Sequence, residues 1–268
     1  MQNRSDSSEM NDRIHCVIDG PIATITNDND AKHNAFDDDM DAALFAMLTD
    51  LRARPDLRAV IWRGEGRSFS SGRDTAAIGT LQVELSHHEL MRRGHRGIQQ
   101  IWDLDAPVIV ACKGWTMGGS FQRALLADIR VAAEGARFRL PELGHGVIPD
   151  TGGVAVLTQM CGHGVVSDLV LTGRIMEADE ALAHGIVSRV VSADELDATV
   201  REMAEQIAGT PAVAVKLARK VIARQVRPAV RASMDDEMIY QTFLNRSDDF
   251  AEFKAARGEQ RPGRYTGS

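Results

Sequence analysis

The chain has few cysteines. It contains 3 cysteines in 268 residues, and Cys16, Cys112 and Cys161 lie far apart in the sequence. This spacing matches neither a CxxC metal site nor a disulfide framework, so we expect reduced, structural cysteines. His87 and His88 have no plausible third ligand near them, and the sequence therefore predicts no metal site.

Long apolar runs and an excess of basic charge are also missing. The longest apolar run is APVIVAC (106–112), which suits a buried strand and is far too short to cross a bilayer. The start, MQNRSDSSEMNDR, has no apolar signal-peptide core, so we expect a disordered leader over residues 1–12 and a cytoplasmic protein without membrane contact. A formal net charge of -7 argues against a nucleic-acid binder, although local basic clusters can hold an anionic ligand.

What the sequence does contain is an alternation of strand and helix patterns. Residues 15–28 are typical of two short strands around an Asp-Gly-Pro turn. Residues 37–56 carry apolar side chains at helical spacing, with acids at the N-terminal end where the helix dipole favours them. Residues 58–66 and 106–114 each indicate a buried strand that runs into a glycine turn. The alternation predicts an α/β fold.

The C-terminal part of the sequence differs from the rest because it shows only helical patterns. These patterns begin before residue 205 and continue on both sides of the break from Gly209 to Pro211. We therefore predict a core domain over residues 13–205 and a helical region over residues 206–268. No feature of the sequence forces an independent boundary between them.

Two glycine turns are the strongest local signals for a binding site. They are GRSFSSGRD (66–74) and GWTMGGS (114–120), and the second runs directly into a helical pattern. Glycine allows close approach of the backbone, and the first N–H groups of a helix lack partners at its positive end. Together these features can hold an anion or an oxyanion, although the glycines can also serve tight turning alone. Neither turn matches a nucleotide-binding fingerprint.

The flanks of both turns resemble the crotonase (enoyl-CoA hydratase/isomerase) superfamily. The resemblance covers about residues 13–262 and is carried by NDNDAKHNAF (27–36), GRSFSSGRD, the long block 106–153, LTGRIMEADEALAHGIVSRVV (171–191) and FAEFKAARGEQRP. It implies a superhelix of repeated ββα turns and a C-terminal helical region that builds trimers, alone or paired as hexamers. It also implies acyl-CoA thioester chemistry, with coenzyme A as part of the substrate and no separate cofactor.

The same resemblance assigns an oxyanion hole to the two glycine turns. The backbone N–H groups of Arg73 and Gly119 would hold the thioester oxygen as it becomes enolate-like, and Ser71, Gly72 and Gly118 would border the substrate. Removing one such donor typically costs roughly 2.7–4 kcal/mol of transition-state stabilisation.

The acids select the reaction, and here the sequence departs from the family pattern. Hydratases of the family usually use two glutamates, but Gln122 occupies the first position, and an amide can orient water without transferring its proton. Glu142 matches the second glutamate; its alternative role is an ion pair with an arginine. Asp150 follows eight residues later, where typical hydratases have glycine. Two carboxylates in one dry pocket shift each other's pKa values apart, although Asp-Thr-Gly-Gly also suits a helix N-cap.

An acid at position 150 resembles both the dienoyl-CoA isomerases and the 4-chlorobenzoyl-CoA dehalogenases, and neither match is complete. The dehalogenases have a tryptophan where this chain has Glu142, and the isomerases have an aspartate where it has Gln122. His95 lies at the spacing where the dehalogenases place a general-base histidine. Its alternative is an ordinary solvated histidine in an arginine-rich helix.

Coenzyme A contacts are expected from basic residues and one aromatic residue. Lys32 and Lys254 are candidates for the CoA phosphates, and Phe253 resembles the family's aromatic residue that contacts the pantetheine or adenine region. Each basic residue alone is also consistent with an ordinary exposed side chain. The acyl group is expected to contact the region from about 76 to 100, whose sequence does not reveal the substrate.

Four functions are consistent with these residues. The first is a hydratase-type lyase that adds water to a 2-enoyl-CoA. The second is an enoyl- or dienoyl-CoA isomerase with Glu142 or Asp150 as base. The third is hydrolysis or dehalogenation, with Asp150 as nucleophile and His95 as base. The fourth is a weakly active acyl-CoA-binding paralogue, which Gln122 favours and Glu142 opposes.

Overall fold

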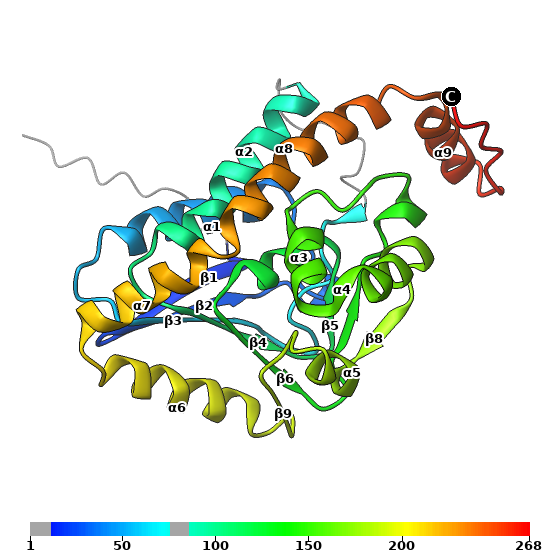
Figure 1. The fold of residues 1–268 in the computed structure, drawn as a ribbon. Helices are drawn as coiled ribbons and strands as arrows, with labels where there is room; N and C mark the ends of the chain where they lie inside the picture. Colours follow the sequence, from blue (N-terminus) through cyan, green and yellow to red (C-terminus); the bar gives the residue numbers. More distant parts are fainter. Residues whose placement is uncertain (1–11, 76–85) are drawn as a thin grey trace, which may run out of the picture.

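The computed structural model describes residues 12–75 and 86–268, and they form an α/β fold around two sheets (Figure 1). The predicted leader lies almost entirely outside the described residues, as does part of the expected acyl-contact region. The larger sheet has the order β1-β2-β3-β4-β6-β9, in which only β1 runs antiparallel to its neighbour. Its strands are β1 (Ile14–Asp19), β2 (Ile22–Asn27), β3 (Ala59–Gly64), β4 (Val108–Cys112), β6 (Ile129–Ala133) and β9 (Arg189–Val191).

A second, smaller sheet extends the glycine turn of residues 114–120. It contains β5 (Trp115–Met117), β7 (Arg137–Arg139) and β8 (Ile175–Glu177), with β7 in the middle. β5 was not predicted, because a three-residue strand inside a glycine turn shows no period of its own. Its pairing partner β7 lies about twenty residues away, so the strand depends on a contact that local patterns do not encode.

Helices cover both faces of the larger sheet. The helices are α1 (Asp38–Arg52), α2 (His87–Gln99), α3 (Gly118–Leu126), α4 (Gly153–Thr172), α5 (Ala178–Ala183), α6 (Leu196–Ala208), α7 (Ala212–Arg224), α8 (Arg227–Leu244) and α9 (Asp248–Gly258). One face packs against α6 through Leu196, Val200 and Ala204. The other face supports α1, α2, α3 and α4, and Figure 1 shows α6 on the opposite side of the sheet from them.

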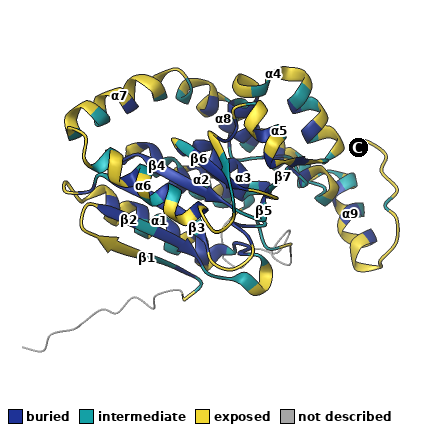
Figure 2. Ribbon diagram, turned by 90° about the horizontal axis from the view of Figure 1, so that it is seen from below, coloured by how far each residue is buried: buried dark blue, intermediate teal, exposed yellow. Residues whose placement is uncertain are grey.

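The local sequence explains where these elements begin. Asp37 caps α1 through the Met40 N–H at 3.1 Å, and acids fill the first turn, as the sequence pattern indicated. Ser86 and Glu89 form a capping box at the start of α2. The central strands β3 and β4 are buried along almost their whole length, which fits the continuous apolar runs typical of parallel strands (Figure 2).

The C-terminal helices return to the core instead of forming a separate layer. α8 packs against α2 and α4, and α9 lies beside the C-terminus at the end of the molecule (Figures 1 and 2). The predicted join at residue 205 falls inside α6, which continues to Ala208. The division into two regions stays a prediction.

One helix among the described residues, α4, has the length and apolar composition of a membrane span. Gly162 interrupts it with φ 77° and ψ 165°, so α4 is two shorter helices joined at a kink. Each part is shorter than the roughly 20 residues that a membrane-crossing helix needs. The cytoplasmic location stays a prediction.

Candidate active site

The two glycine turns meet at the carboxyl ends of β3 and β4. Ser70 joins them, because its N–H donates to the Trp115 carbonyl and its carbonyl accepts from the Met117 N–H, both at 3.0 Å. Gly72 follows with φ 90°, and a Cβ atom there would lie 2.7 Å from the Met117 carbonyl oxygen and 3.4 Å from the Gly119 nitrogen. Only glycine lets the two turns approach this closely.

Two backbone N–H groups remain available at this junction. Phe36 pairs with both neighbours of Arg73, through the Gly72 carbonyl at 2.8 Å and the Asp74 N–H at 2.7 Å. Alternation along an extended chain therefore turns the Arg73 N–H to the other side. Gly119 lies in the first turn of α3, where an N–H has no intrahelical partner. Within the described chain, neither N–H donates a hydrogen bond.

Both N–H groups border a cavity of about 370 Å³. The predicted site residues that line it are Ser71, Gly72, Arg73, His95, Gly118, Gly119, Glu142, Asp150 and Lys254. The structure therefore brings together the expected oxyanion hole, both candidate carboxyl groups and the candidate histidine. Their catalytic roles stay predictions.

Glu142 lies beside the glycines of the second turn, in the short helix η4 (Glu142–His145). Its side chain is buried, and one oxygen, Oε1, accepts from Gln122 Nε2 at 3.0 Å. The other oxygen, Oε2, has no hydrogen-bond partner among the described residues. A Cβ atom on Gly118 would lie 3.5 Å from Oε1, which places this carboxyl next to the oxyanion hole.

Burial determines the protonation of Glu142. Loss of solvent, together with the nearby Asp150 charge, raises the pKa of Glu142 to about 8, while hydrogen bonds from its own backbone and from Gln122 oppose the shift. The carboxyl is therefore mainly neutral at pH 7 and can donate a proton. The described residues form no ion pair with Glu142, so the expected alternative of a structural arginine partner is wrong.

Asp150 lies on the segment that leads into α4 and also faces the cavity. The N-cap of α4 is Gly152, without a side-chain cap, so the expected alternative of Asp150 as a helix cap is wrong. Burial raises the pKa of Asp150, whereas the charges of His95, Arg123 and Arg73 act in the opposite direction. Asp150 thus has cationic neighbours that Glu142 lacks.

His95 is a buried residue of α2, only 9% exposed, and not the solvated surface histidine that the arginine-rich sequence also allowed. Its Nε2 forms a hydrogen bond with the main-chain carbonyl of Asp150. Because a carbonyl only accepts, Nε2 carries a proton in this arrangement. The ring therefore fixes the backbone that carries Asp150.

Gln122 does not line the cavity, although it occupies the position of the first family glutamate. It is fully buried behind the wall, where α3 packs on α4, and a Cβ atom on Gly153 would lie 2.5 Å from its Cγ. Its Oε1 accepts from the Thr151 N–H at 2.9 Å while its Nε2 donates to Glu142. The amide therefore connects the segments that carry Glu142 and Asp150, and it contacts no open space for a substrate.

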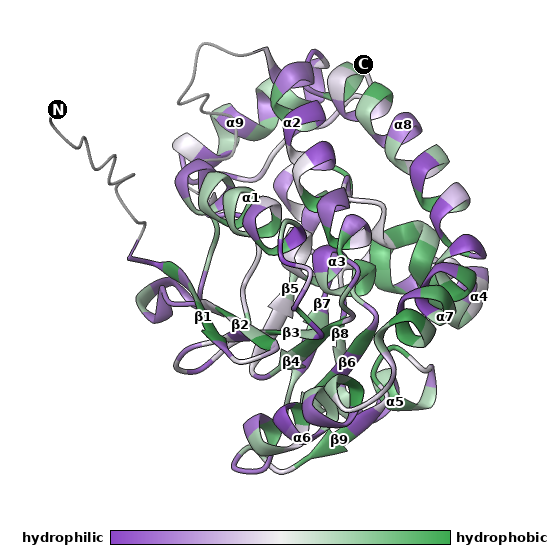
Figure 3. Ribbon diagram, turned by 90° about the vertical axis from the view of Figure 1, so that its left-hand side faces the viewer, coloured by the Kyte–Doolittle hydropathy of each residue, from purple (hydrophilic) through white to green (hydrophobic). Residues whose placement is uncertain are grey.

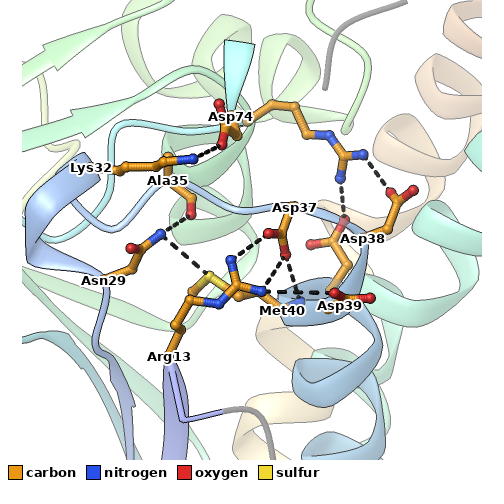
Figure 4. Close-up of polar contacts among 11 residues, drawn as sticks. Arg13, Asn29, Lys32, Ala35, Asp37, Asp38, Asp39, Met40 and Asp74 are labelled. Atoms are coloured by element: carbon orange, nitrogen blue, oxygen red, sulfur yellow. Dashed lines mark hydrogen bonds and ion pairs between the residues drawn. The ribbon is translucent and has the colours of Figure 1, made fainter. Parts of the chain in front are cut away.

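The residues expected to contact coenzyme A differ in their position relative to the cavity. Lys32 forms an ion pair with Asp74 at 2.7 Å and lies outside the cavity wall (Figure 4). Phe253 is buried against Gly146, where an added Cβ atom would lie 2.8 Å from the ring. Lys254 lines the cavity with its Nζ 4.9 Å from the centre of the Phe250 ring.

Three contributors to the site were missed by the sequence analysis. Phe250, not Phe253, is the phenylalanine of α9 that lines the cavity, and the two rings stack with centroids 6.2 Å apart. Arg123 also lines the cavity and forms an ion pair with Asp41 at 2.7 Å. The Arg73 guanidinium bonds Asp41 at 3.2 Å and also Asp38. A signal was present only for the phenylalanines, whose spacing of three places them on one helix face.

This geometry can be compared with known proteins. The model of the enoyl-CoA hydratase/isomerase family matches residues 18–267. The chain belongs to the enoyl-CoA hydratase/isomerase family. A similar curated enzyme, the carnitinyl-CoA dehydratase of Salmonella typhi, is 39% identical over 213 residues, which are 79% of this chain and 80% of that enzyme. The family membership confirms the resemblance seen in the sequence and the expectation of an acyl-CoA enzyme.

Solved structures agree with this assignment. An enoyl-CoA hydratase/isomerase from Pseudoalteromonas atlantica T6c superposes with a TM-score of 0.85 at 27% identity, covering 95% of this chain and 100% of that one. An enoyl-CoA hydratase/carnithine racemase from Magnetospirillum magneticum gives a TM-score of 0.75 at 30% identity, covering 96% of each chain. The predicted crotonase-like α/β fold is therefore confirmed, while trimer formation stays a prediction.

The described residues offer no group of three or more His, Cys, Asp or Glu side chains that could hold a metal ion.

Proposed function

We propose that this enzyme adds water reversibly across the double bond of a 2-enoyl-CoA thioester. One observation carries the proposal: a single cavity contains two unpaired backbone N–H groups and, beside them, the unpaired Oε2 of Glu142. The Arg73 and Gly119 N–H groups would hold the thioester oxygen, which makes an enolate accessible. Coenzyme A arrives as part of the substrate, and no further cofactor takes part.

The two carboxyl groups divide the proton transfers. Burial raises the pKa of both carboxyl groups, that of Glu142 to about 8; we assign Glu142 as the neutral partner because the charges of Arg123 and Arg73 oppose the rise at Asp150, whereas the neighbouring Asp150 charge adds to it at Glu142. In hydration, Asp150 removes a proton from a water molecule while the oxygen of that water bonds to the β-carbon. The electron pair of the double bond shifts toward the thioester carbonyl, and its oxygen takes up the negative charge of the enolate. Glu142 then gives its proton to the α-carbon. Dehydration reverses each step.

The position of Glu142 supports this division. The carboxyl lies next to Gly118, so a thioester oxygen at the Gly119 N–H brings the adjacent α-carbon close to it. Asp150 lines the same cavity from the segment that leads into α4, and we assign it to the water that adds at the β-carbon. Gln122 donates a hydrogen bond to Glu142 from behind the cavity wall. It occupies the position of the first family glutamate, but its amide cannot transfer a proton.

The acyl group that we propose is short and polar. Asp150 brings a second carboxyl to the cavity wall, where a long saturated chain would offer it no polar partner. The similarity to a carnitinyl-CoA dehydratase agrees with this proposal. At the CoA side, Lys254 and Phe250 would contact a phosphate and the pantetheine chain.

An isomerase is the second candidate, and the presence of Asp150 in the same cavity as Glu142 favours it. Two carboxyl groups at different distances from the thioester can move a proton along the acyl chain. Water would then take no part in the reaction, and the product would have the mass of the substrate.

The proposal is tested by mass-resolved reactions with a panel of short enoyl-CoA thioesters that includes crotonyl-CoA. We expect a gain of one water with the natural protein, lost in Glu142→Gln and retained in Glu134→Gln, an exposed acid on the turn after β6. A shifted double bond without mass change would support the isomerase instead. Binding of every thioester without turnover would support the acyl-CoA-binding paralogue and contradict both enzymes.

A further inference from the structure

The backbone segment that carries Asp150 is held by the C-terminal helix α8. Gln241 accepts from the Ile148 N–H at 3.0 Å, and Glu237 accepts from the Gly152 N–H at 2.8 Å. These two acceptors lie four residues apart on one face of α8 and hold the segment on both sides of Asp150. The helical region that the sequence predicted for oligomerisation therefore reaches the candidate active site.

The close approach of α8 explains why the cap of α4 comes from another helix. Gly152 has φ 74°, and a Cβ atom there would lie 2.5 Å from Val230 Cγ1. No side chain fits at this position, so the N-cap residue cannot satisfy the first N–H groups of α4 by itself. Glu237 instead accepts from the N–H of the N-cap residue itself, and a carboxylate is the group that the positive end of a helix favours.

Glu237 is a buried acid without a cationic partner among the described residues. It is 6% exposed, and its second oxygen accepts from the Ser233 hydroxyl at 2.8 Å. Burial raises the pKa of Glu237 to about 7, and the charges of Asp150 and Asp236 act in the same direction, while the bonds from Ser233 and Gly152 oppose it. A glutamine could accept from the Gly152 N–H and donate to the Ser233 hydroxyl without burying a charge, so the acid at this position carries a cost that a glutamine would not.

We propose that Glu237 is a positioning residue for the reaction: from α8 it fixes the backbone that carries Asp150, and its charge acts on the Asp150 carboxyl. Asp150 is faced by His95 from α2, by Arg123 from α3, by Arg73 from the first glycine turn and by Glu142 from η4. Asp150 and Glu237 repel each other, so the charge of an ionised Glu237 acts against the positive charges of Arg73 and Arg123. Asp150 can therefore both take up and release a proton during turnover.

Two substitutions separate the hydrogen bond from the charge. Glu237→Gln keeps an acceptor for the Gly152 N–H and removes the charge, whereas Glu237→Ala removes both. Asp235→Asn, on the exposed side of α8, is the matched control for a lost charge on the same helix. The inference rests on the proposed function only for its kinetic readout. The other two readouts need no turnover.

The first readout is hydrogen exchange in the peptide that contains residues 148–153. Loss of a buried acceptor leaves the Gly152 N–H unpaired, so we expect exchange about tenfold faster in Glu237→Ala and unchanged exchange in Glu237→Gln and Asp235→Asn. The second readout is infrared titration of the Asp150 carboxyl, identified by its absence in Asp150→Asn. Its midpoint is expected at lower pH in Glu237→Gln, because a repelling charge is gone.

Crotonyl-CoA hydration supplies the third readout. We expect kcat to fall about tenfold or more in Glu237→Ala with little change in KM, and Glu237→Gln to change the pH profile more than the maximal rate. Unchanged exchange in Glu237→Ala together with an unmoved Asp150 titration in Glu237→Gln would overturn the inference. An enzyme that does not hydrate the thioester but shows both changes would contradict the proposed function and retain the inference.

Discussion

At the scale of single residues, the proposed chemistry depends on two carboxyl groups with unlike surroundings. The sequence could predict that Glu142 and Asp150 matter, because both stand at informative positions of a recognisable pattern. It could not predict how their surroundings differ, since Arg73 and Arg123 reach Asp150 from separate segments and oppose the rise of its pKa. Gln122 shows the same limit: its identity was evident, but its position behind the wall was not.

The pH dependence of hydration tests the assignment of Glu142 as the proton donor. Because its pKa is raised to about 8, the carboxyl is protonated below that pH and loses its proton above it. We therefore predict that kcat/KM for hydration falls as the pH rises through about 8. The measurement is a pH profile on a short enoyl-CoA. A rate that instead increases through this range would mean that ionised Glu142 activates the water alone.

At the scale of elements, the site is made by contacts between segments that are far apart in the chain. The sequence predicted the strands and helices that contain strong periodic patterns, including α1, α3 and the buried β3 and β4. It did not predict β5, or the hold of α8 on the segment before α4, because both depend on pairings between distant residues. Local sequence patterns predict a helix or strand better than they predict which other elements it contacts.

Gly72→Ala tests the contact between the two glycine turns. The new methyl group would lie 2.7 Å from the Met117 carbonyl oxygen, so the turns must separate and the two N–H groups move apart. We predict a loss of kcat of about a hundredfold, as expected for the loss of one oxyanion donor. Gly135→Ala is the matched control, because φ there is 75° and no atom lies within 4 Å of the added methyl group.

Both variants carry the cost of a left-handed alanine, roughly 1–2 kcal/mol of stability, which thermal unfolding measures. Only Gly72→Ala is expected to lose activity beyond that cost. Equal activity losses in the two variants would show that the backbone conformation alone matters and that the contact with Met117 does not.

At the scale of the whole molecule, apolar side chains remain exposed along the outer side of α7. Val213, Leu217 and Val221 follow at intervals of four residues and are 68%, 55% and 67% exposed in the single chain. Figure 3 shows α7 at the edge of the fold. A contiguous apolar stripe of this kind is typical of an interaction surface. We therefore expect the trimer that the family resemblance implied.

Leu217→Glu tests this expectation. A charge in the middle of the stripe would be buried at the subunit contact, so we predict dissociation to smaller species in light scattering coupled to size-exclusion chromatography. Val17→Glu, on an exposed position of the edge strand β1, is the control and should leave the mass unchanged. The mass of the natural protein also distinguishes a trimer from a hexamer. A monomeric natural protein would contradict the expectation.

The most direct test of the central claim measures exchange of the α-hydrogens of butyryl-CoA in heavy water. This saturated thioester cannot take up water, so exchange reports only enolate formation and the group that moves the α-proton. We predict exchange with the natural protein and with Asp150→Asn, and a loss of at least about a hundredfold in Glu142→Gln. Exchange that survives in Glu142→Gln but disappears in Asp150→Asn would contradict the roles given to both carboxyl groups.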